Sequence, residues 1–239
     1  LDKNDVVFSN GFFDTTRANF EHRGTICFDI PTEKASDLSK PKLFKGDIDA
    51  KKLRKLLSRY GKRAKFVLMT LTNNTGGGQP ASLKNVELAG NIAAKKELKF
   101  IIDACRIAEN AYFIWLREQK RKGNVKNIIR KLFSLSDLAY MSAKKDGLAN
   151  SGGFIVTNDR SLAAKFRELA VLYEGYITYG GMTGRDMETI ARGLEEVVSP
   201  TYLEHRIGQI AYLHNELVKI GVPLIHPPGG HAVYIDAGK

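Results

Sequence analysis

The hydrophobic positions of the chain form short β-rich runs that alternate with longer stretches of helical periodicity. The apolar and β-branched runs predict strands at residues 6–8, 26–30, 65–72, 99–103, 138–141, 154–157 and, near the end, 232–235. Apolar residues spaced three and four apart predict helices at residues 49–60, 83–97, 106–120, 161–174 and 186–220. This alternation predicts an α/β fold in which helices cover a mostly parallel sheet.

Length and composition favour a globular protein with a sizeable core, since 43% of the 239 residues are hydrophobic. Apolar runs such as residues 66–69 and 100–102 are far too short to cross a bilayer, and the first residues lack the order of a signal peptide. The two cysteines, Cys27 and Cys105, have no paired spacing that would indicate a disulfide framework or a zinc site. We therefore expect a cytoplasmic protein with no membrane partner.

The formal net charge of +11 leaves two interpretations open. The densest basic stretches, residues 51–65 and 120–131, carry apolar residues at helical spacing in or beside them, which is typical of the solvated faces of amphipathic helices. The alternative is a non-catalytic basic module that binds nucleic acid or a partner protein, because a basic face releases counterions from phosphates. No nucleic-acid-binding motif accompanies the charge, so the sequence disfavours nucleic acid as a partner.

Three polar clusters follow predicted strands, where open α/β sheets bind their ligands. The first is TNNTGGGQP at residues 72–80, in which glycines allow close approach of the backbone and Asn74 offers a donor and an acceptor. A simple turn before a helix explains this segment as well. The second holds Asp103 and Arg106; the carboxylate could bind a protonated pyridine nitrogen, pair with Arg106 or cap a helix.

The third cluster, MSAKKDG at residues 141–147, contains Ser142, Lys144 and Lys145. A lysine forms a Schiff base only as a neutral amine, which a neighbouring cation such as Lys144 promotes, although two surface lysines in a turn would look the same. Taken in order, the three clusters supply a ring contact, a counter-ion for a pyridinium, a phosphate ligand and a Schiff-base lysine. That set predicts pyridoxal phosphate as the cofactor.

Further short segments complete the pattern: FFDTT at 12–16, FKGD at 44–47, AENAYFI at 108–114, YGG at 179–181 and GGHA at 229–232. With these segments in this order the sequence resembles the β-eliminating lyases, the family of tryptophanase and tyrosine phenol-lyase, from near its first residue to its last. The resemblance implies a fold-type-I large domain that binds pyridoxal phosphate. It also implies a homotetramer with active sites between paired subunits.

The resemblance assigns roles to the clustered residues. It implies that Lys145 holds the cofactor and removes the substrate α-proton, and that Asp103 keeps the pyridine nitrogen protonated. Arg106 and Asn74 would face the ring oxygen, and Ser142 would bind the phosphate.

Other residues have more peripheral roles under the same resemblance. Phe13 would stack on the cofactor ring, and Asp14 would assist departure of the leaving group. Lys144 and the backbone of Asn150 correspond to positions near a monovalent-cation site, which K⁺ could occupy. A structural role explains Glu109 to Tyr112 and His231 equally well, so the predicted site excludes them.

The implied reaction is conversion of L-tryptophan and water to indole, pyruvate and ammonia. Asp14, Ala143 and residues 72–74 favour tryptophan as the substrate, whereas residues 184–188 are more like tyrosine phenol-lyase, which would release phenol from L-tyrosine. We interpret residues 1–239 as the cofactor-binding large domain. The family's amino-terminal segment and carboxyl-terminal small domain have no counterpart in this sequence, so we expect little lyase activity from the chain alone.

Overall fold

The computed structural model describes residues 1–176, 178 and 180–238. Ile177, Tyr179 and Lys239 lie outside the described residues, so the structure gives no account of the first position of the YGG segment at 179–181.

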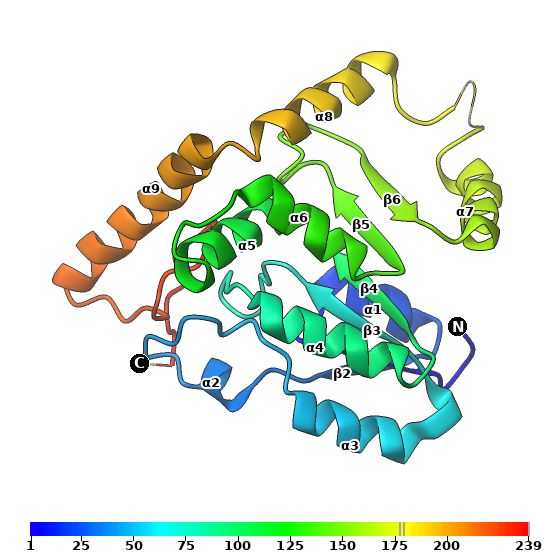
Figure 1. Cartoon of the computed structure of the whole chain (residues 1–239), viewed down its shortest axis with the longest axis horizontal. Coiled ribbons are helices and arrows are strands. Elements are labelled where there is room, and N and C mark those ends of the chain that lie inside the picture. Colours follow the sequence, from blue (N-terminus) through cyan, green and yellow to red (C-terminus); the bar gives the residue numbers. More distant parts are fainter. Residues whose placement is uncertain (177, 179, 239) are drawn as a thin grey trace.

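Six strands form one sheet in the order β2-β1-β3-β4-β5-β6 (Figure 1). The strands are β1 Val6–Ser9, β2 Ile26–Asp29, β3 Ala64–Thr70, β4 Lys99–Asp103, β5 Leu138–Ser142 and β6 Gly153–Thr157. The first five are parallel to their neighbours, and β6 runs antiparallel to β5. The mostly parallel sheet and the α/β class are therefore confirmed, and six of the seven strands predicted from apolar runs are found within a few residues of their expected bounds.

The helices connect and flank these strands. They are α1 Asp14–His22, α2 Glu33–Ser36, α3 Ala50–Tyr60, α4 Leu83–Ala94, α5 Ile107–Phe113, α6 Val125–Ser134, α7 Arg160–Tyr173, α8 Gly184–Glu196 and α9 Pro200–Lys219, with short turns η1 Gly61–Arg63 and η2 Ile114–Glu118. Most begin at side-chain caps. In α3, for example, Asp49 Oδ1 accepts hydrogen bonds from the amides of Lys51 and Lys52 at 2.9 Å.

The core lies on both faces of the sheet because alternate strand residues point to opposite sides. Val6, Phe8, Val67 and Met69 face the larger cluster, which α3, α4, α5 and α6 complete. Val7, Phe66 and Leu68 face a smaller cluster, against which Phe20 of α1 packs. Figure 1 shows α4, α5 and α6 in front of the sheet and α1 behind it.

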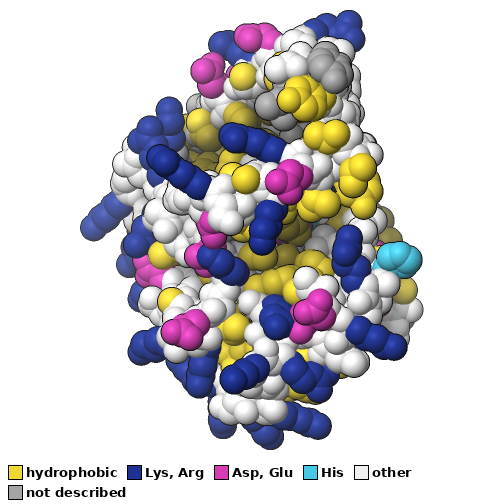
Figure 2. Space-filling view, turned by 90° about the vertical axis from the view of Figure 1, so that its right-hand side faces the viewer, with side chains coloured by type: hydrophobic (Ala, Val, Ile, Leu, Met, Phe, Trp, Pro, Cys, Tyr) yellow, Lys and Arg dark blue, Asp and Glu magenta, His cyan; other side chains and the backbone are white. Residues whose placement is uncertain are grey.

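The helical parts of the two basic stretches are solvated faces of amphipathic helices, as expected, whereas Lys120 to Lys122 lie in the turn before α6. In α3, Leu53 and Leu57 are buried while the neighbouring lysines are exposed, and in α6 Ile128 and Leu132 are buried. Figure 2 shows lysine and arginine side chains spread singly over one face, with acidic and hydrophobic side chains between them. Within the described residues, every helix is too short or too polar to cross a membrane.

Three predictions of secondary structure need correction. The single helix predicted at 186–220 is two helices, because Pro200 lacks an N–H and starts α9 at its first turn. Residues 232–235 form no strand; only Ile235 makes an isolated bridge, with Leu224. The helix α1 was not predicted, since none of its residues is buried and its sequence lacks an apolar stripe.

The ends of β1 and β3 are joined by one buried side chain, that of Asn10. Its Nδ2 donates to the carbonyl oxygens of Gly46 at 2.8 Å and Thr70 at 3.1 Å, and its Oδ1 accepts from the amide of Thr70 at 2.9 Å. Because Asn10 is only 4% exposed, water cannot replace these hydrogen bonds. The amide therefore fixes the edge of the sheet where the loops after β1 and β3 begin.

We expect Asn10→Ala to lower the free energy of unfolding by about 1–3 kcal/mol, because it leaves buried backbone groups without partners. Urea unfolding followed by circular dichroism measures the change. The control is Asn19→Ala in α1, where an exposed amide donates only to Thr15 in its own helix; it should cost less than about 0.5 kcal/mol. Equal effects of the two substitutions would contradict this role of Asn10.

Candidate functional site

The candidate site lies at the carboxyl ends of the parallel strands. Phe13 follows β1, Asn74 follows β3, Asp103 ends β4, and Ser142 ends β5 with Lys145 just beyond it. These four strands are adjacent and parallel, so their ends meet at one edge of the sheet. The fold thus brings the residues predicted from three separate segments to the same edge.

Lys145 and Phe13 face each other across this edge. The Lys145 Nζ lies 5.7 Å from the centroid of the Phe13 ring. Lys145 is half-buried, whereas its neighbour Lys144 is exposed. Among the described residues, the Lys145 amine has no hydrogen-bond or ion-pair partner, so it is available to react.

Asp103 is a buried carboxylate that lacks a cationic partner among the described residues. Its side chain accepts hydrogen bonds from the amide of Cys105 at 3.1 Å and from the hydroxyl of Tyr140 at 3.0 Å. The residue is 3% exposed, and no ion pair joins it to Arg106. A buried carboxylate in this state is costly, and a protonated pyridine nitrogen would supply the missing positive charge. The site therefore fits pyridoxal phosphate on this point.

Both side chains beside Asp103 stay neutral at ordinary pH. Burial, and next the charge of Asp103, raise the pKa of Cys105 to about 12 and also raise the pKa of Tyr140 above its ordinary value. The Tyr140 hydroxyl also lies 3.3 Å from Thr16 Oγ1 on α1, and Cys105 Sγ accepts from the amide of Ser142 at 3.2 Å. These neutral groups hold Asp103 in place without neutralising it.

Asn74 and Arg106 converge on Tyr234, which belongs to the loop after α9. The Tyr234 hydroxyl donates to Asn74 Oδ1 at 2.7 Å, and His231 Nε2 lies 2.6 Å from the same oxygen. The Tyr234 hydroxyl is thus a donor to Asn74 Oδ1. Burial raises the pKa of Tyr234, while the nearby positive charge of Arg106 opposes this rise.

The Gly-rich segment of the first cluster supports the loop that carries Tyr234. Gly77 and Gly78 have φ of 80° and 67°, which favours glycine at both positions. The amide of Gly230 donates to the carbonyl of Gly78 at 3.1 Å, and a Cβ on Gly229 would lie 2.4 Å from the carbonyl oxygen of Gly77. The glycines therefore serve close packing of two chain segments.

Glu109 on α5 is fully buried and has three partners. Its Oε1 pairs with Arg206 Nη2 at 2.6 Å, and its Oε2 accepts from the hydroxyl of Thr72 at 3.1 Å. His231 Nδ1 lies 3.1 Å from the same Oε2. Because a carboxylate only accepts, this contact is a hydrogen bond with the proton on Nδ1.

Asp146, directly after Lys145, is the second fully buried carboxylate at this edge. Its Oδ1 pairs with Arg206 Nη1 at 3.1 Å, and its Oδ2 accepts from the amide of Ala108 at 2.7 Å. Burial, and next the charge of Glu109, raise the pKa of Asp146 to about 7, against the opposing effect of Arg206. The two carboxylates thus share one guanidinium.

Arg206, Asp146, Tyr140 and Tyr234 were not predicted as site residues, and Glu109 and His231 were placed outside the predicted site. One signal was available: Glu109 and Asn110 stand side by side in α5, a helix whose residues are all buried. Polar residues at such positions need specific partners. Arg206 carried no such signal, because basic residues are ordinary on a long surface helix.

Some predicted residues have few contacts in this chain. Asp14 is exposed at the first position of α1, and Lys144 and Asn150 are exposed in the loop after β5. Ser142 is half-buried, with its amide bonded to Cys105. In the part of the chain that the structure describes, no group of three or more His, Cys, Asp or Glu side chains could hold a metal ion.

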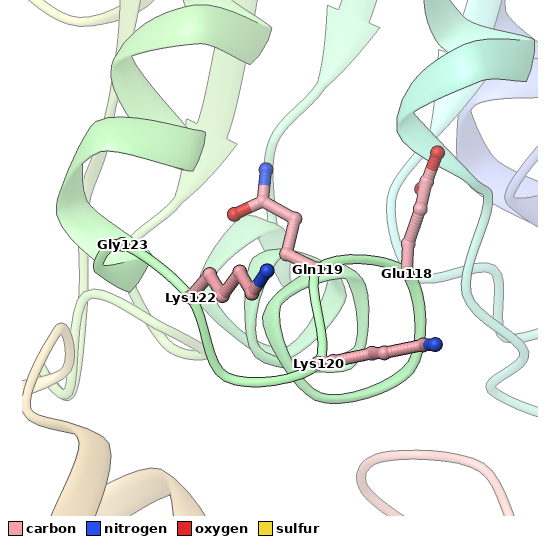
Figure 3. A pocket seen from close by; sticks show the side chains of 5 residues that line it. All are labelled: Glu118, Gln119, Lys120, Lys122 and Gly123. Atoms are coloured by element: carbon pink, nitrogen blue, oxygen red, sulfur yellow. The ribbon is translucent and has the colours of Figure 1, made fainter.

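A surface hollow lies apart from these residues. It is lined by Glu118, Gln119, Lys120, Lys122 and Gly123, which follow one another at the end of η2 and in the turn after it (Figure 3). None of the strand-end residues lines it, and its side chains come from a single turn. We assign it no part in the site.

Comparisons with known proteins show the family to which the chain is related. Residues 2–237 match the family model described as beta-eliminating lyase. The chain is 45% identical over 234 residues to a tryptophanase of Hyphomonas neptunium, covering 98% of this chain and 52% of that protein. It is 47% identical over 232 residues to a probable tryptophanase of Aeropyrum pernix, covering 97% and 50%. A tyrosine phenol-lyase of Clostridium tetani is 45% identical over 235 residues, covering 98% and 51%.

The chain thus spans about half the length of these relatives. Among solved structures it resembles a chain in the crystal structure of a complex of SepCysS with the SepCysE N-terminal domain. The TM-score is 0.62 at 16% sequence identity, covering 97% of this chain and 57% of that chain. This likeness shows the fold, which is the predicted fold-type-I arrangement.

The raised pKa of Cys105 has a measurable consequence. At pH 8 a thiol with a pKa of about 12 is ionised in about one molecule in 10⁴, so alkylation by iodoacetamide should be about 1000-fold slower than for an ordinary cysteine. The measurement uses a Cys27→Ser background, so that only Cys105 reacts. In urea, where the protein is unfolded, Cys105 should be alkylated at the rate of an ordinary cysteine. Asp103→Asn should speed the reaction, because it removes a charge that raises the pKa of Cys105. Native alkylation at the rate of a free thiol would contradict the prediction.

Proposed function

The chain belongs to the β-eliminating lyase family, and we propose that it is the large cofactor-binding domain of a lyase that cleaves L-tryptophan to indole, pyruvate and ammonia. The family implies dependence on pyridoxal phosphate. One observation carries the proposal for this chain: the buried Asp103 carboxylate, with no cationic partner among the described residues, lies at the same sheet edge as the Lys145 amine near the Phe13 ring.

When bound, pyridoxal phosphate supplies a conjugated ring that withdraws electrons from the substrate α-carbon. Asp103 would hold a proton on the ring nitrogen, which keeps that ring electron-poor. Phe13 would cover one face of the ring and exclude water from it. The side-chain amide of Asn74 and the guanidinium of Arg106 would donate to the ring oxygen, and the Ser142 hydroxyl would donate to the phosphate.

Lys145 would have two tasks. Its amine would first hold the cofactor aldehyde covalently and, once displaced by the substrate amine, would accept the α-proton. The half-buried position beside Phe13 suits both, because the amine has no partner to release first within the part of the chain that the structure describes. Asp14, at the start of α1 next to Phe13, would assist protonation of the leaving group.

The leaving group is proposed to be indole. The relatives named above include both tryptophanases and a tyrosine phenol-lyase at similar identity. Asp14 and Ala143 favour the tryptophan reaction, while residues 184–188 favour cleavage of L-tyrosine to phenol. Both reactions use the same cofactor residues. The choice between the two substrates therefore depends on the protein groups that contact the leaving ring.

We also propose a monovalent-cation site at the backbone of Asn150, with Lys144 nearby, where K⁺ would bind. The assembly implied by the resemblance is a homotetramer, and the implied compartment is the cytoplasm. The exposed positions of Asn150 and Lys144 on the loop after β5 are compatible with ligands supplied from a second subunit.

Pyruvate release tests the proposed reaction. With the protein at the full length that its gene encodes and pyridoxal phosphate added, we expect release from L-tryptophan to exceed release from L-tyrosine. Asp103→Asn should lower the rate about 100-fold or more, because it removes the charge that keeps the ring nitrogen protonated. Asp2→Asn removes the same charge from an exposed position and should leave the rate unchanged. Faster pyruvate release from L-tyrosine than from L-tryptophan would show that L-tyrosine is the substrate. Normal turnover by Asp103→Asn would refute the role of Asp103.

Borohydride reduction tests which lysine holds the cofactor. Reduction fixes the cofactor on its lysine, and peptide mapping should find the label on Lys145. Lys145→Arg should abolish both label and visible absorbance, whereas Lys144→Arg, at the exposed neighbouring position, should keep both. A label on Lys144 alone would show that the assignment is wrong.

A further inference from the structure

Arg206 connects two buried carboxylates that come from different parts of the chain. It lies on α9, and Figure 1 shows α9 running past α5 at the same side of the molecule. Nη2 pairs with Glu109 at 2.6 Å and Nη1 pairs with Asp146 at 3.1 Å. Both carboxylate side chains are 0% exposed, and that of Arg206 is 23% exposed. The planar guanidinium thus uses two separate nitrogens for two acids.

The Asp146 branch reaches Lys145. Asp146 follows Lys145 directly in the chain, and its amide donates to the carbonyl of Cys105 at 3.2 Å. Its Oδ2 accepts from the amide of Ala108 at 2.7 Å, in the first turn of α5. Hydrogen bonds of Asp146 therefore connect the backbone beside Lys145 to residues 105 and 108, which follow Asp103. Arg206 binds the Asp146 carboxylate that accepts one of these hydrogen bonds.

The Glu109 branch reaches Asn74. Glu109 Oε2 accepts from the Thr72 hydroxyl at 3.1 Å and from His231 Nδ1 at 3.1 Å. His231 Nε2 lies 2.6 Å from Asn74 Oδ1. One continuous set of polar contacts therefore leads from Asn74, through Glu109 and Arg206, to the residue beside Lys145.

Close packing supports the loop that carries Lys145 from another side. A Cβ on Gly193 of α8 would lie 2.0 Å from the carbonyl oxygen of Gly147, so α8 touches this loop with no space for a side chain. The loop is thus held between α8 and the start of α5. The backbone that carries Asp146 and Lys145 is therefore closely packed on this side as well.

We propose that Arg206 is a positioning residue of this site: by bridging Asp146 and Glu109 it fixes the Lys145 amine relative to the Asn74 amide. The inference rests on the proposed function, in which both groups contact one cofactor. An ion pair with a purely structural role would need only the charge of Arg206. A positioning role also needs the planar guanidinium, because one of its terminal nitrogens contacts Glu109 and the other contacts Asp146.

Arg206→Lys separates the two roles. It keeps the positive charge, so the buried carboxylates remain compensated and the protein folds, but a single flexible ammonium does not reproduce two parallel contacts. Arg206→Gln removes the charge as well and reports the cost of the uncompensated carboxylates. The control is Arg121→Gln, which breaks an exposed ion pair at 3.0 Å with Glu204 on the same helix α9.

The first measurement uses the cofactor-free protein. Hydrogen exchange followed by mass spectrometry should show amides of residues 105–110 and 143–149 exchanging about 10-fold faster in Arg206→Lys, with a thermal midpoint near that of the wild type. Arg121→Gln should match the wild type in both. Faster exchange spread evenly over the whole chain, with a lowered thermal midpoint, would mean a structural role and overturn the proposal.

The second measurement uses the protein loaded with pyridoxal phosphate, at its full encoded length. Arg206→Lys should bind the cofactor about 10-fold more weakly and lower kcat about 10- to 100-fold, with KM within about threefold of the wild type. Wild-type exchange, cofactor affinity and kcat in Arg206→Lys would overturn the proposal. Failure of the wild type to bind the cofactor would refute the proposed function instead, and the exchange experiment would still decide whether Arg206 holds the loop.

Discussion

A carboxylate that is removed from water must find positive charge or many hydrogen-bond donors, and three carboxylates face this requirement at one edge of the sheet. Asp146 and Glu109 meet it by sharing Arg206, with backbone amides and neighbouring polar side chains as further donors. Asp103 meets it only in part, because its donors are the amide of Cys105 and the hydroxyl of Tyr140, both neutral. Asp146 and Glu109 thus have a cationic partner, whereas Asp103 has only neutral donors among the described residues.

The parallel sheet explains why these groups meet. Strands β1, β3, β4 and β5 all end at the same edge, and each delivers the start of a loop that carries polar side chains. Asn10 joins the ends of β1 and β3, so the loops bearing Phe13 and Asn74 begin from fixed positions. The loop after α9 then covers this edge by packing Gly229 and Gly230 against Gly77 and Gly78. The rigid sheet thus supports a polar site in which Phe13, Asn74 and Lys145 stand on connecting segments.

Much of this could be predicted from the order of residues along the chain. Asp103 and Ser142 end apolar runs, and Asn74 and Lys145 follow such runs closely, so their common location followed from the rule that parallel strands present their carboxyl ends together. Helix α1 could not be predicted, because it buries none of its residues and carries no periodic signal. The break between α8 and α9 does have a local signal, Pro200, which lacks the N–H that a continuous helix would need.

The sequence by itself determined where most strands and helices lie and which chemically active side chains stand at strand ends, since these follow from local periodicity and chain order. It also carried the resemblance to the β-eliminating lyases, through short segments in a fixed order. Only the tertiary structure decided which buried charges are compensated. Arg106, near Asp103 in the chain, forms no ion pair with it, whereas the distant Arg206 binds both Asp146 and Glu109. The physical reason is that burial and counter-charge depend on neighbours in space, and packing of α9 against α5 brings those neighbours together.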